Sequence, residues 1–228
     1  MDRAAFYKHL RKRDSGVFGT SLSQRQVDGI EPLLDAGHDL SLHHMANVLG
    51  QVYHETGGKM YPVRETFAAS DQQAINRLEH AWEKGDLPWV TEPYWRDGYF
   101  GRGQIQLTFK RNYDKFGITD PDDALKPSIS ADVAVRGMRN GMFTGKRLAD
   151  FQFPDDLDAP PASNPRRIVN GQDGKDDEVA GYHRAFASAL AEGGWNAPDT
   201  SARPEARPQP EPSGFWTKLF RAILGGSR

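Results

Sequence analysis

The segment LHHMANVLGQVYHETGG, residues 42–58, decides the fold. From Leu42 to Tyr53 its apolar residues recur three or four positions apart, which is the period of one face of an α-helix. Gly57 and Gly58 then interrupt the pattern, and glycine is typical of the residues that follow a helix end. We therefore predict a helix from about Leu42 to Thr56 that packs one face against a core.

Similar patterns on both sides of this segment predict further helices. Ser23, with Gln26 three residues later, has the form of a capping box ahead of an apolar face, and Gly37 ends that helix. Residues 88–102 are rich in aromatic and turn-forming residues and predict a loop. Alternation typical of strands is scarce, so the fold class expected is mainly α with little β-sheet. Further helices are expected over residues 71–84, 130–142 and 177–191.

Composition limits the class of protein. The chain has 228 residues, 37% of them hydrophobic, and no cysteine. This length fits one domain with an appendage, and the lack of cysteine excludes disulfides and cysteine-ligated metal sites. The net charge of −2 gives no general attraction to nucleic acid, so none is expected as a partner. Residues 1–13 lack the apolar core of a secretory signal, so we expect the chain to be cytoplasmic as synthesised.

The composition changes near residue 197. Residues 197–214 contain five prolines and predict an extended linker after a domain spanning residues 1–196. The tail Phe215–Arg228 places aromatic and aliphatic residues at helical spacing beside basic residues, with no acid. Two interpretations stay open: the tail docks on its own domain or a partner, or it contacts an anionic membrane surface.

Two glutamates ten residues apart are candidates for catalysis. Glu55 falls in the last turn of the predicted central helix, where the negative end of the helix dipole favours a protonated acid. Glu65 follows the glycine break and Pro62, so the chain can turn back towards Glu55. Two carboxyl groups in different environments can serve glycoside hydrolysis. Two unrelated surface glutamates are the simpler interpretation of this pair taken alone.

Metal chemistry is not expected. His54 and Glu55 begin a zinc-protease pattern, but the position of the second histidine is Gly58. Residues 170–178 are acidic and contain glycine, yet they do not fit the spacing of a calcium loop and predict a solvated loop. No cofactor is expected.

The second motif is YFGRGQIQLT, residues 99–108, followed by Asn112 and Tyr113. Neutral hydrogen-bonding side chains beside aromatic rings are what a polyhydroxylated, N-acetylated sugar requires. The pattern of a phosphate-binding loop is absent. Tyr99 and Tyr113 are equally compatible with core packing, and His54 with a structural role near the acid. The neutral candidates are Gln104, Gln106, Thr108 and Asn112.

Three motifs in order carry a resemblance to a known family. HETGG at 54–58, YFGRGxIQLT at 99–108 with Asn112 and Tyr113, and RIVNG at 167–171 resemble glycoside hydrolase family 19. That family contains plant-type chitinases and phage endolysins, and the resemblance covers about residues 20–190. The lack of cysteines and the small size are more similar to phage or prophage lysis enzymes.

The resemblance implies a lysozyme-like helical fold with two lobes and a substrate cleft. Glu55 would be the general acid, Glu65 the base that activates water, and Thr108 a residue that holds this water. The reaction would invert the anomeric centre, which requires carboxyl groups roughly 6.5–9.5 Å apart. The sugar cleft would be lined by Gln106, Asn112 and Asn170.

The chain departs from the family pattern at three positions. Gln104 stands where plant members have proline, and Arg111 where they have tyrosine. Glu178 stands near the position of an arginine that supports the acid in plant members. The arginines able to replace it are Arg166, Arg167 and Arg184.

The function expected from this resemblance is that of an endolysin, which hydrolyses β-1,4 glycosidic bonds of peptidoglycan and acts in the periplasm after release. The partner would be the glycan strand, and the protein is expected to be a monomer. The first alternative is a chitinase acting on N-acetylglucosamine polymers. The second is a non-catalytic module that binds cell walls.

Overall fold

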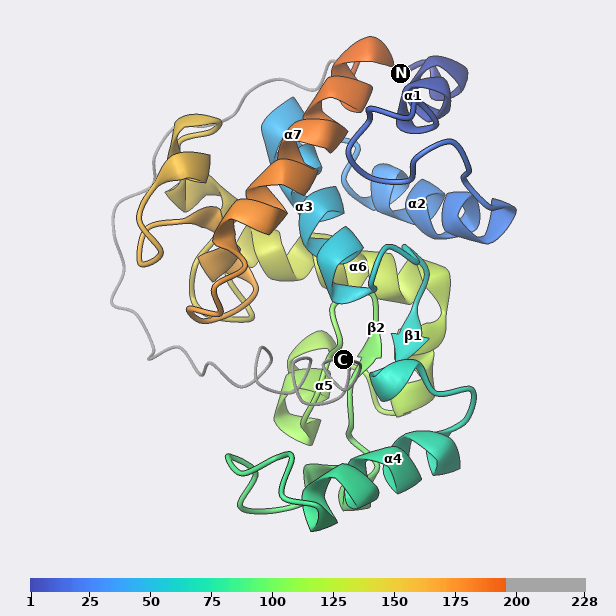
Figure 1. Ribbon diagram of the computed structural model, residues 1–228, viewed down its shortest axis with the longest axis vertical. Coiled ribbons are helices and arrows are strands. Elements are labelled where there is room, and N and C mark those ends of the chain that lie inside the picture. Colours follow the sequence, from blue (N-terminus) through green and yellow to red (C-terminus); the bar gives the residue numbers. More distant parts are fainter. Residues whose placement is uncertain (196–228) are drawn as a thin grey trace.

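The computed structural model describes residues 1–195 and is mainly helical, which confirms the predicted fold class (Figure 1). The predicted linker and tail lie outside the described residues, and the two-lobed cleft implied by the resemblance stays a prediction. No helix among residues 1–195 is long and apolar enough to cross a membrane. The helices are α1 Arg3–Leu10, α2 Gln24–Ala36, α3 Leu42–Glu55, α4 Asp71–Glu83, α5 Lys110–Phe116, α6 Pro127–Asn140 and α7 Asp176–Glu192, and the strands are β1 Val63–Arg64 and β2 Arg102–Gly103.

The helix ends follow the predicted capping chemistry. The side chain of Ser23 accepts a hydrogen bond from the backbone N–H of Gln26 at 3.2 Å, and the Gln26 side chain accepts one from the Ser23 N–H at 2.8 Å. The capping box at the start of α2 is therefore confirmed. At the start of α3 the Ser41 side chain accepts a hydrogen bond from the backbone N–H of His44, and α3 ends at Glu55, one residue before the predicted end.

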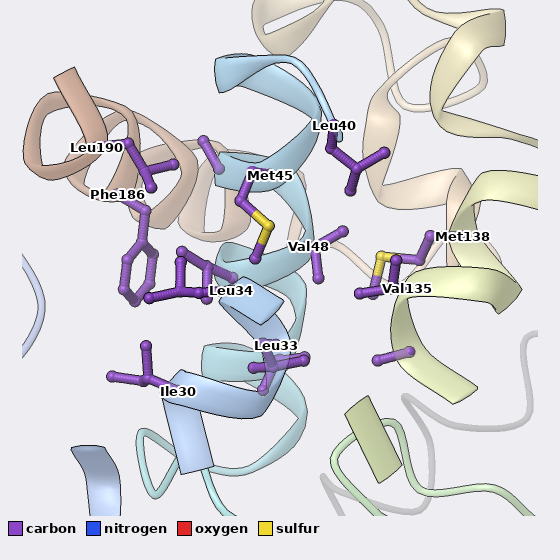
Figure 2. Packing of buried hydrophobic residues seen from close by; sticks show 14 of the residues in the cluster. Ile30, Leu33, Leu34, Leu40, Met45, Val48, Val135, Met138, Phe186 and Leu190 are labelled. Atoms are coloured by element: carbon purple, nitrogen blue, oxygen red, sulfur yellow. The ribbon is translucent and has the colours of Figure 1, made fainter. Parts of the chain in front are cut away.

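Helix α3 is the centre of the packing. It lies along α7 and contacts α2 and α6, so every position from His44 to Val52 is buried (Figures 1 and 2). Burying one Leu, Val or Met side chain contributes about 1.5–3 kcal/mol, so the main core holds α3 firmly. The residues in Figure 2 include Ile30, Leu33 and Leu34 of α2, Met45 and Val48 of α3, Val135 and Met138 of α6, and Phe186 and Leu190 of α7.

A second apolar cluster belongs to α4 and the loop after it. Figure 1 places α4 at the end of the molecule away from α1 and α2. Ala74 and Leu78 of α4 are fully buried against Trp95 and Phe100, whereas Trp82 is only partly buried. The predicted loop at 88–102 contains a short 3-10 helix, Tyr94–Asp97, that places Trp95 in this cluster.

Strands β1 and β2 form a small antiparallel sheet with Val63 opposite Gly103 and Arg64 opposite Arg102. Two residues per strand are too few to give a periodic pattern, so the sequence did not predict it. Arg102 is buried and pairs with Asp71 at 2.6 Å and with Asp122 at 2.9 Å. These ion pairs join the sheet to α4 and to the turn before α6.

A histidine is buried between α3 and α7. The His183 Nε2 lies 3.2 Å from Nδ1 of His43, and the His183 ring stacks on Phe153. Its Nδ1 has no hydrogen-bond partner among residues 1–195. Burial, followed by the nearby His43, Arg184 and His44, lowers the pKa of His183 to about 3.

We predict that His183 reduces stability in acid. Since an unfolded histidine binds a proton near pH 6.5 and folded His183 only near pH 3, the unfolded state holds one more proton between these values. The free energy of unfolding should fall in this window as pH falls, by up to about 1.4 kcal/mol per pH unit. His183→Phe should remove that component in urea unfolding between pH 4 and 7. His80→Phe, on the exposed side of α4, should keep the wild-type slope, and equal slopes in both variants would contradict the prediction.

Candidate active site

Glu65 directly follows β1, and the sheet places it beside Gly101. The backbone N–H of Glu65 donates to the carbonyl of Gly101 at 2.7 Å. In return the Gly101 N–H donates to Oε2 of Glu65 at 2.6 Å. The first residue after β1 is thus locked to the residue before β2 through both backbone and side chain.

The carboxyl group of Glu65 is almost fully buried. The hydroxyl of Tyr94 donates to Oε1 at 2.6 Å. Burial raises the pKa of Glu65 to about 7, although the bonds from Tyr94 and Gly101 and the charge of Arg102 act to lower it. A carboxyl group that changes charge near neutral pH is suited to accept a proton from water. The resemblance implied that Glu65 acts as a base, and its burial places its ionisation close to neutral pH.

Gln106 and Thr108 lie on the same side of Gly101 as Glu65. A Cβ atom at position 101 would stand 2.9 Å from Oε1 of Gln106 and 3.3 Å from both Oε2 of Glu65 and Oγ1 of Thr108. Only glycine leaves room for these three oxygens to gather there. The motif at residues 99–108 and Glu65 therefore meet at Gly101.

Backbone strain collects in the same region. Five non-glycine residues among 1–195 have positive φ, a conformation that costs of order 1–3 kcal/mol and is concentrated at functional sites in proteins. Two of them directly follow Glu65 and two flank Thr108. The five are Met60, Thr66, Phe67, Gln106 and Phe109.

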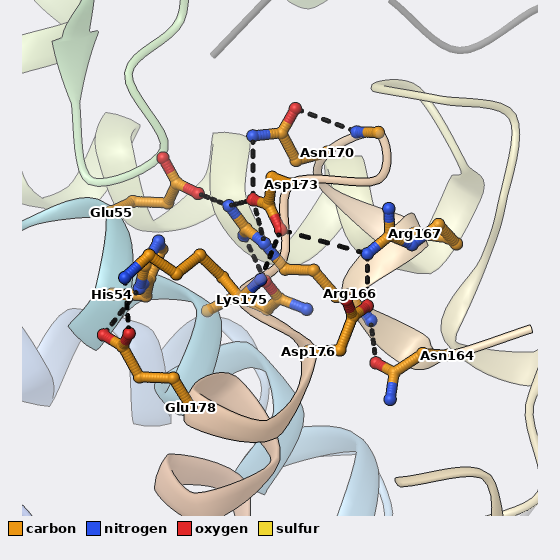
Figure 3. A network of polar contacts seen from close by, with 12 residues as sticks. His54, Glu55, Asn164, Arg166, Arg167, Asn170, Asp173, Lys175, Asp176 and Glu178 are labelled. Carbon is orange, nitrogen blue, oxygen red and sulfur yellow. Dashed lines mark hydrogen bonds and ion pairs between the residues drawn. The ribbon is translucent and has the colours of Figure 1, made fainter. Parts of the chain in front are cut away.

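Glu55 is the last residue of α3 and is also buried. Nη2 of Arg166 lies 2.7 Å from its Oε1 (Figure 3). The same guanidinium donates from Nε and Nη2 to Oδ2 of Asp173 at 2.9 and 2.8 Å, and from Nη1 to Oε1 of Gln51 at 2.7 Å. Burial opposes the charge on Arg166, but Glu55 and Asp173 outweigh it and raise its pKa.

Arg166 is thus the arginine that contacts the candidate acid. Arg167 pairs instead with Asp176, and Arg184 pairs with Asp158 on the surface. Of the three arginines that the sequence left open, only Arg166 has a side chain within ion-pair distance of Glu55.

The expectation of a solvated loop at residues 170–178 is wrong for its central part. The side chains of Asp173 and Asp176 are buried against the guanidinium groups of residues 166 and 167, and Asn170 is buried beside Asp173 (Figure 3). Glu178 matches the expectation, since it is more than a third exposed and contacts His54 and Lys175. Gln172, Gly174 and Asp177 are exposed as well.

The network around Glu55 contains more carboxyl groups than guanidinium groups. Three carboxyl groups, those of Glu55, Asp173 and Asp176, face two guanidinium groups, those of Arg166 and Arg167. With all five groups ionised, this buried network has one more negative charge than positive charges. The sequence predicted only the helix end beside Glu55, whereas the structure adds the cation of Arg166 at ion-pair distance.

Three predicted sugar-binding residues, Gln104, Gln106 and Tyr113, hold the backbone instead. The Gln106 amide donates to the carbonyls of Val63 and Gly103, at 3.0 Å each. The side-chain amide of Gln104 is fully buried and donates to the carbonyls of Gly29 and Met60. Tyr113 is fully buried and donates to the carbonyl of Phe100 at 2.9 Å. The observed contacts of these side chains are internal.

The other candidates differ in exposure. Asn112 is half-buried and donates to the carbonyl of Thr108 at 2.8 Å, and Tyr99 packs edge-on against Tyr113. Asn170 accepts from the Gly171 N–H at 2.8 Å. His54 lies 3.4 Å from Glu178, and burial lowers its pKa.

Sequence reasoning missed three residues of the site. Tyr94, Gln51 and Asp173 contact the candidate carboxyl groups or their arginine. Gln51 lies four residues before Glu55 on α3, so its place on the same helix face was a usable signal. Tyr94 lies in a separate loop, and no sequence pattern indicated that it would contact Glu65.

Comparison of the chain with models of known protein families, with curated proteins and with solved structures gives no match.

We predict that Arg166→Leu lowers the free energy of unfolding by about 3–5 kcal/mol, because it leaves buried carboxylates without their cation. Urea unfolding at neutral pH measures the change. Arg184→Leu is the matched control and should change stability little, since its ion pair with Asp158 is exposed. Equal losses in the two variants would show that the buried network does not support the fold.

Proposed function

We propose that the protein is a glycoside hydrolase that cleaves the β-1,4 linked glycan strand of peptidoglycan and serves in bacterial lysis. The observation that carries the proposal is Glu65, a buried carboxyl group with a pKa near 7 that shares one side of Gly101 with Gln106 and Thr108. A module that only binds sugars needs no such group.

Glu55 is proposed as the general acid. Glu55 and Asp173 share the guanidinium group of Arg166, and Glu55 has fewer contacts with it. Oε1 of Glu55 forms an ion pair with Nη2 of Arg166 at 2.7 Å, whereas Asp173 accepts from two N–H groups of Arg166 and from the Lys175 backbone. As the general acid, Glu55 would hold a proton and pass it to the glycosidic oxygen.

Glu65 is proposed as the general base. Thr108 donates its hydroxyl hydrogen to the carbonyl of Gln106 at 3.1 Å, so its oxygen is available to accept a hydrogen bond from water. Glu65 takes a proton from this water while the water oxygen bonds to the anomeric carbon. The bond to the leaving oxygen breaks and that oxygen receives the proton of Glu55, which inverts the anomeric centre.

Chitin shares the β-1,4 linked N-acetylated backbone, and a chitinase is the alternative that an assay must separate. Loss of turbidity of chloroform-treated Gram-negative cells, beside release of sugar from colloidal chitin, distinguishes the two. Lysis with no chitin hydrolysis supports the proposal, and the reverse result supports a chitinase.

Glu55→Gln should lower kcat on purified peptidoglycan by at least 10²–10⁴-fold, because the leaving oxygen loses its proton donor. Circular dichroism should show an unchanged fold. Glu92→Gln, in an exposed loop, should keep wild-type activity. Proton NMR of the first products should show the α-anomer at the new reducing end, and substantial activity of Glu55→Gln would remove it from the acid role.

The pH profile tests Glu65. Activity should fall as pH drops through about 7, because the base becomes protonated. Tyr94→Phe removes a hydrogen bond that favours the ionised form, so it should move this midpoint to higher pH while activity at pH 9 is retained. Tyr7→Phe on α1 should leave the midpoint in place. If Tyr94→Phe leaves the midpoint unchanged, the loss of activity at low pH does not come from protonation of Glu65.

A further inference from the structure

The turn that follows Glu55 contacts the turn that follows Glu65. Gly57 lies two residues after Glu55, and Phe67 lies two residues after Glu65. A Cβ atom at position 57 would stand 3.2 Å from Cζ of Phe67, so the ring packs directly on this glycine. The Thr66–Phe67 turn therefore borders both halves of the proposed active site.

Two cations approach this turn from different elements. The ammonium group of Lys59 lies over the Phe67 ring, 5.0 Å from its centroid. From α4, Nη1 of Arg77 donates to the backbone carbonyl of Thr66 at 2.8 Å. The ring and the carbonyl hold the two positive charges beside the turn.

Neither cation has a carboxylate partner in the part of the chain that the structure describes. Within residues 1–195 no carboxylate lies within ion-pair distance of Lys59 or Arg77, whereas Arg64 and Arg102 nearby each pair with two aspartates. Arg77 is exposed and Lys59 half-buried, so a ligand can reach both. Arg77 uses one N–H on Thr66, which leaves the rest of its planar fork for a carboxylate.

The two candidate substrates, chitin and peptidoglycan, differ in charge. Chitin is neutral, whereas the peptide branches of peptidoglycan carry carboxylates. We infer that Lys59 and Arg77 bind carboxylates of the peptide branch and so select peptidoglycan over neutral glycans. This inference rests on the proposed function, and it assigns specificity to a surface outside the carboxyl pair.

The test compares one wall preparation in two charge states: native peptidoglycan, and the same material after carbodiimide coupling of its carboxyl groups to ethanolamine. The full-length double variant Lys59→Glu/Arg77→Glu should raise KM on the native wall roughly tenfold with little change in kcat, because two attractions become repulsions. On the neutralised wall it should match the wild type. Arg13→Glu, an exposed cation beyond α1, is the control and should behave as the wild type on both.

Binding separates this inference from the proposed function. In the Glu55→Gln background, co-sedimentation with native wall should weaken in the double variant by a similar factor and not with the neutralised wall. A wild-type protein that hydrolyses neither wall would overturn the proposed function, while co-sedimentation would still test the two cations. A double variant that binds and hydrolyses native wall like Arg13→Glu would overturn the inference.

Discussion

The buried contact between Glu55 and Arg166 is the constraint on which the rest of the candidate site depends. Removing two charged groups from water costs several kcal/mol each, and the cost is offset only when the remaining hydrogen-bonding atoms are satisfied. Arg166 meets this condition through Gln51 on α3 and Asp173 in the segment before α7. The end of α3 is thereby fixed to a segment more than a hundred residues away in sequence (Figure 3).

The two candidate carboxyl groups are buried in different ways, and this difference separates their proposed roles. Glu55 belongs to a network of alternating charges that, with all groups ionised, has one more negative charge than positive charges. Glu65 has no cation within ion-pair distance among residues 1–195 and is held by the Tyr94 hydroxyl and the Gly101 N–H. Environments that differ in this way are what allow two identical side chains to act as acid and base.

Much of the helical framework could be predicted because its helices are long enough to show a period. Helices α2, α3, α4, α6 and α7 each have at least 13 residues, and each coincides with a predicted segment. Helices α1 and α5 were missed because, at 8 and 7 residues, they make only about two turns. The sheet has two residues per strand and is fixed by the ion pairs of Arg102 with Asp71 and Asp122.

The sequence by itself determined the mainly helical class, the helix that ends at Glu55, and the choice of Glu65, Gln106 and Thr108 as candidates, because these depend on local spacing and residue chemistry. Only the tertiary structure decided which arginine meets Glu55, that Gln104 and Tyr113 are used inside the fold, and that Glu65 ionises near neutral pH. Those outcomes depend on burial and on partners from distant segments, and neither quantity is contained in local spacing.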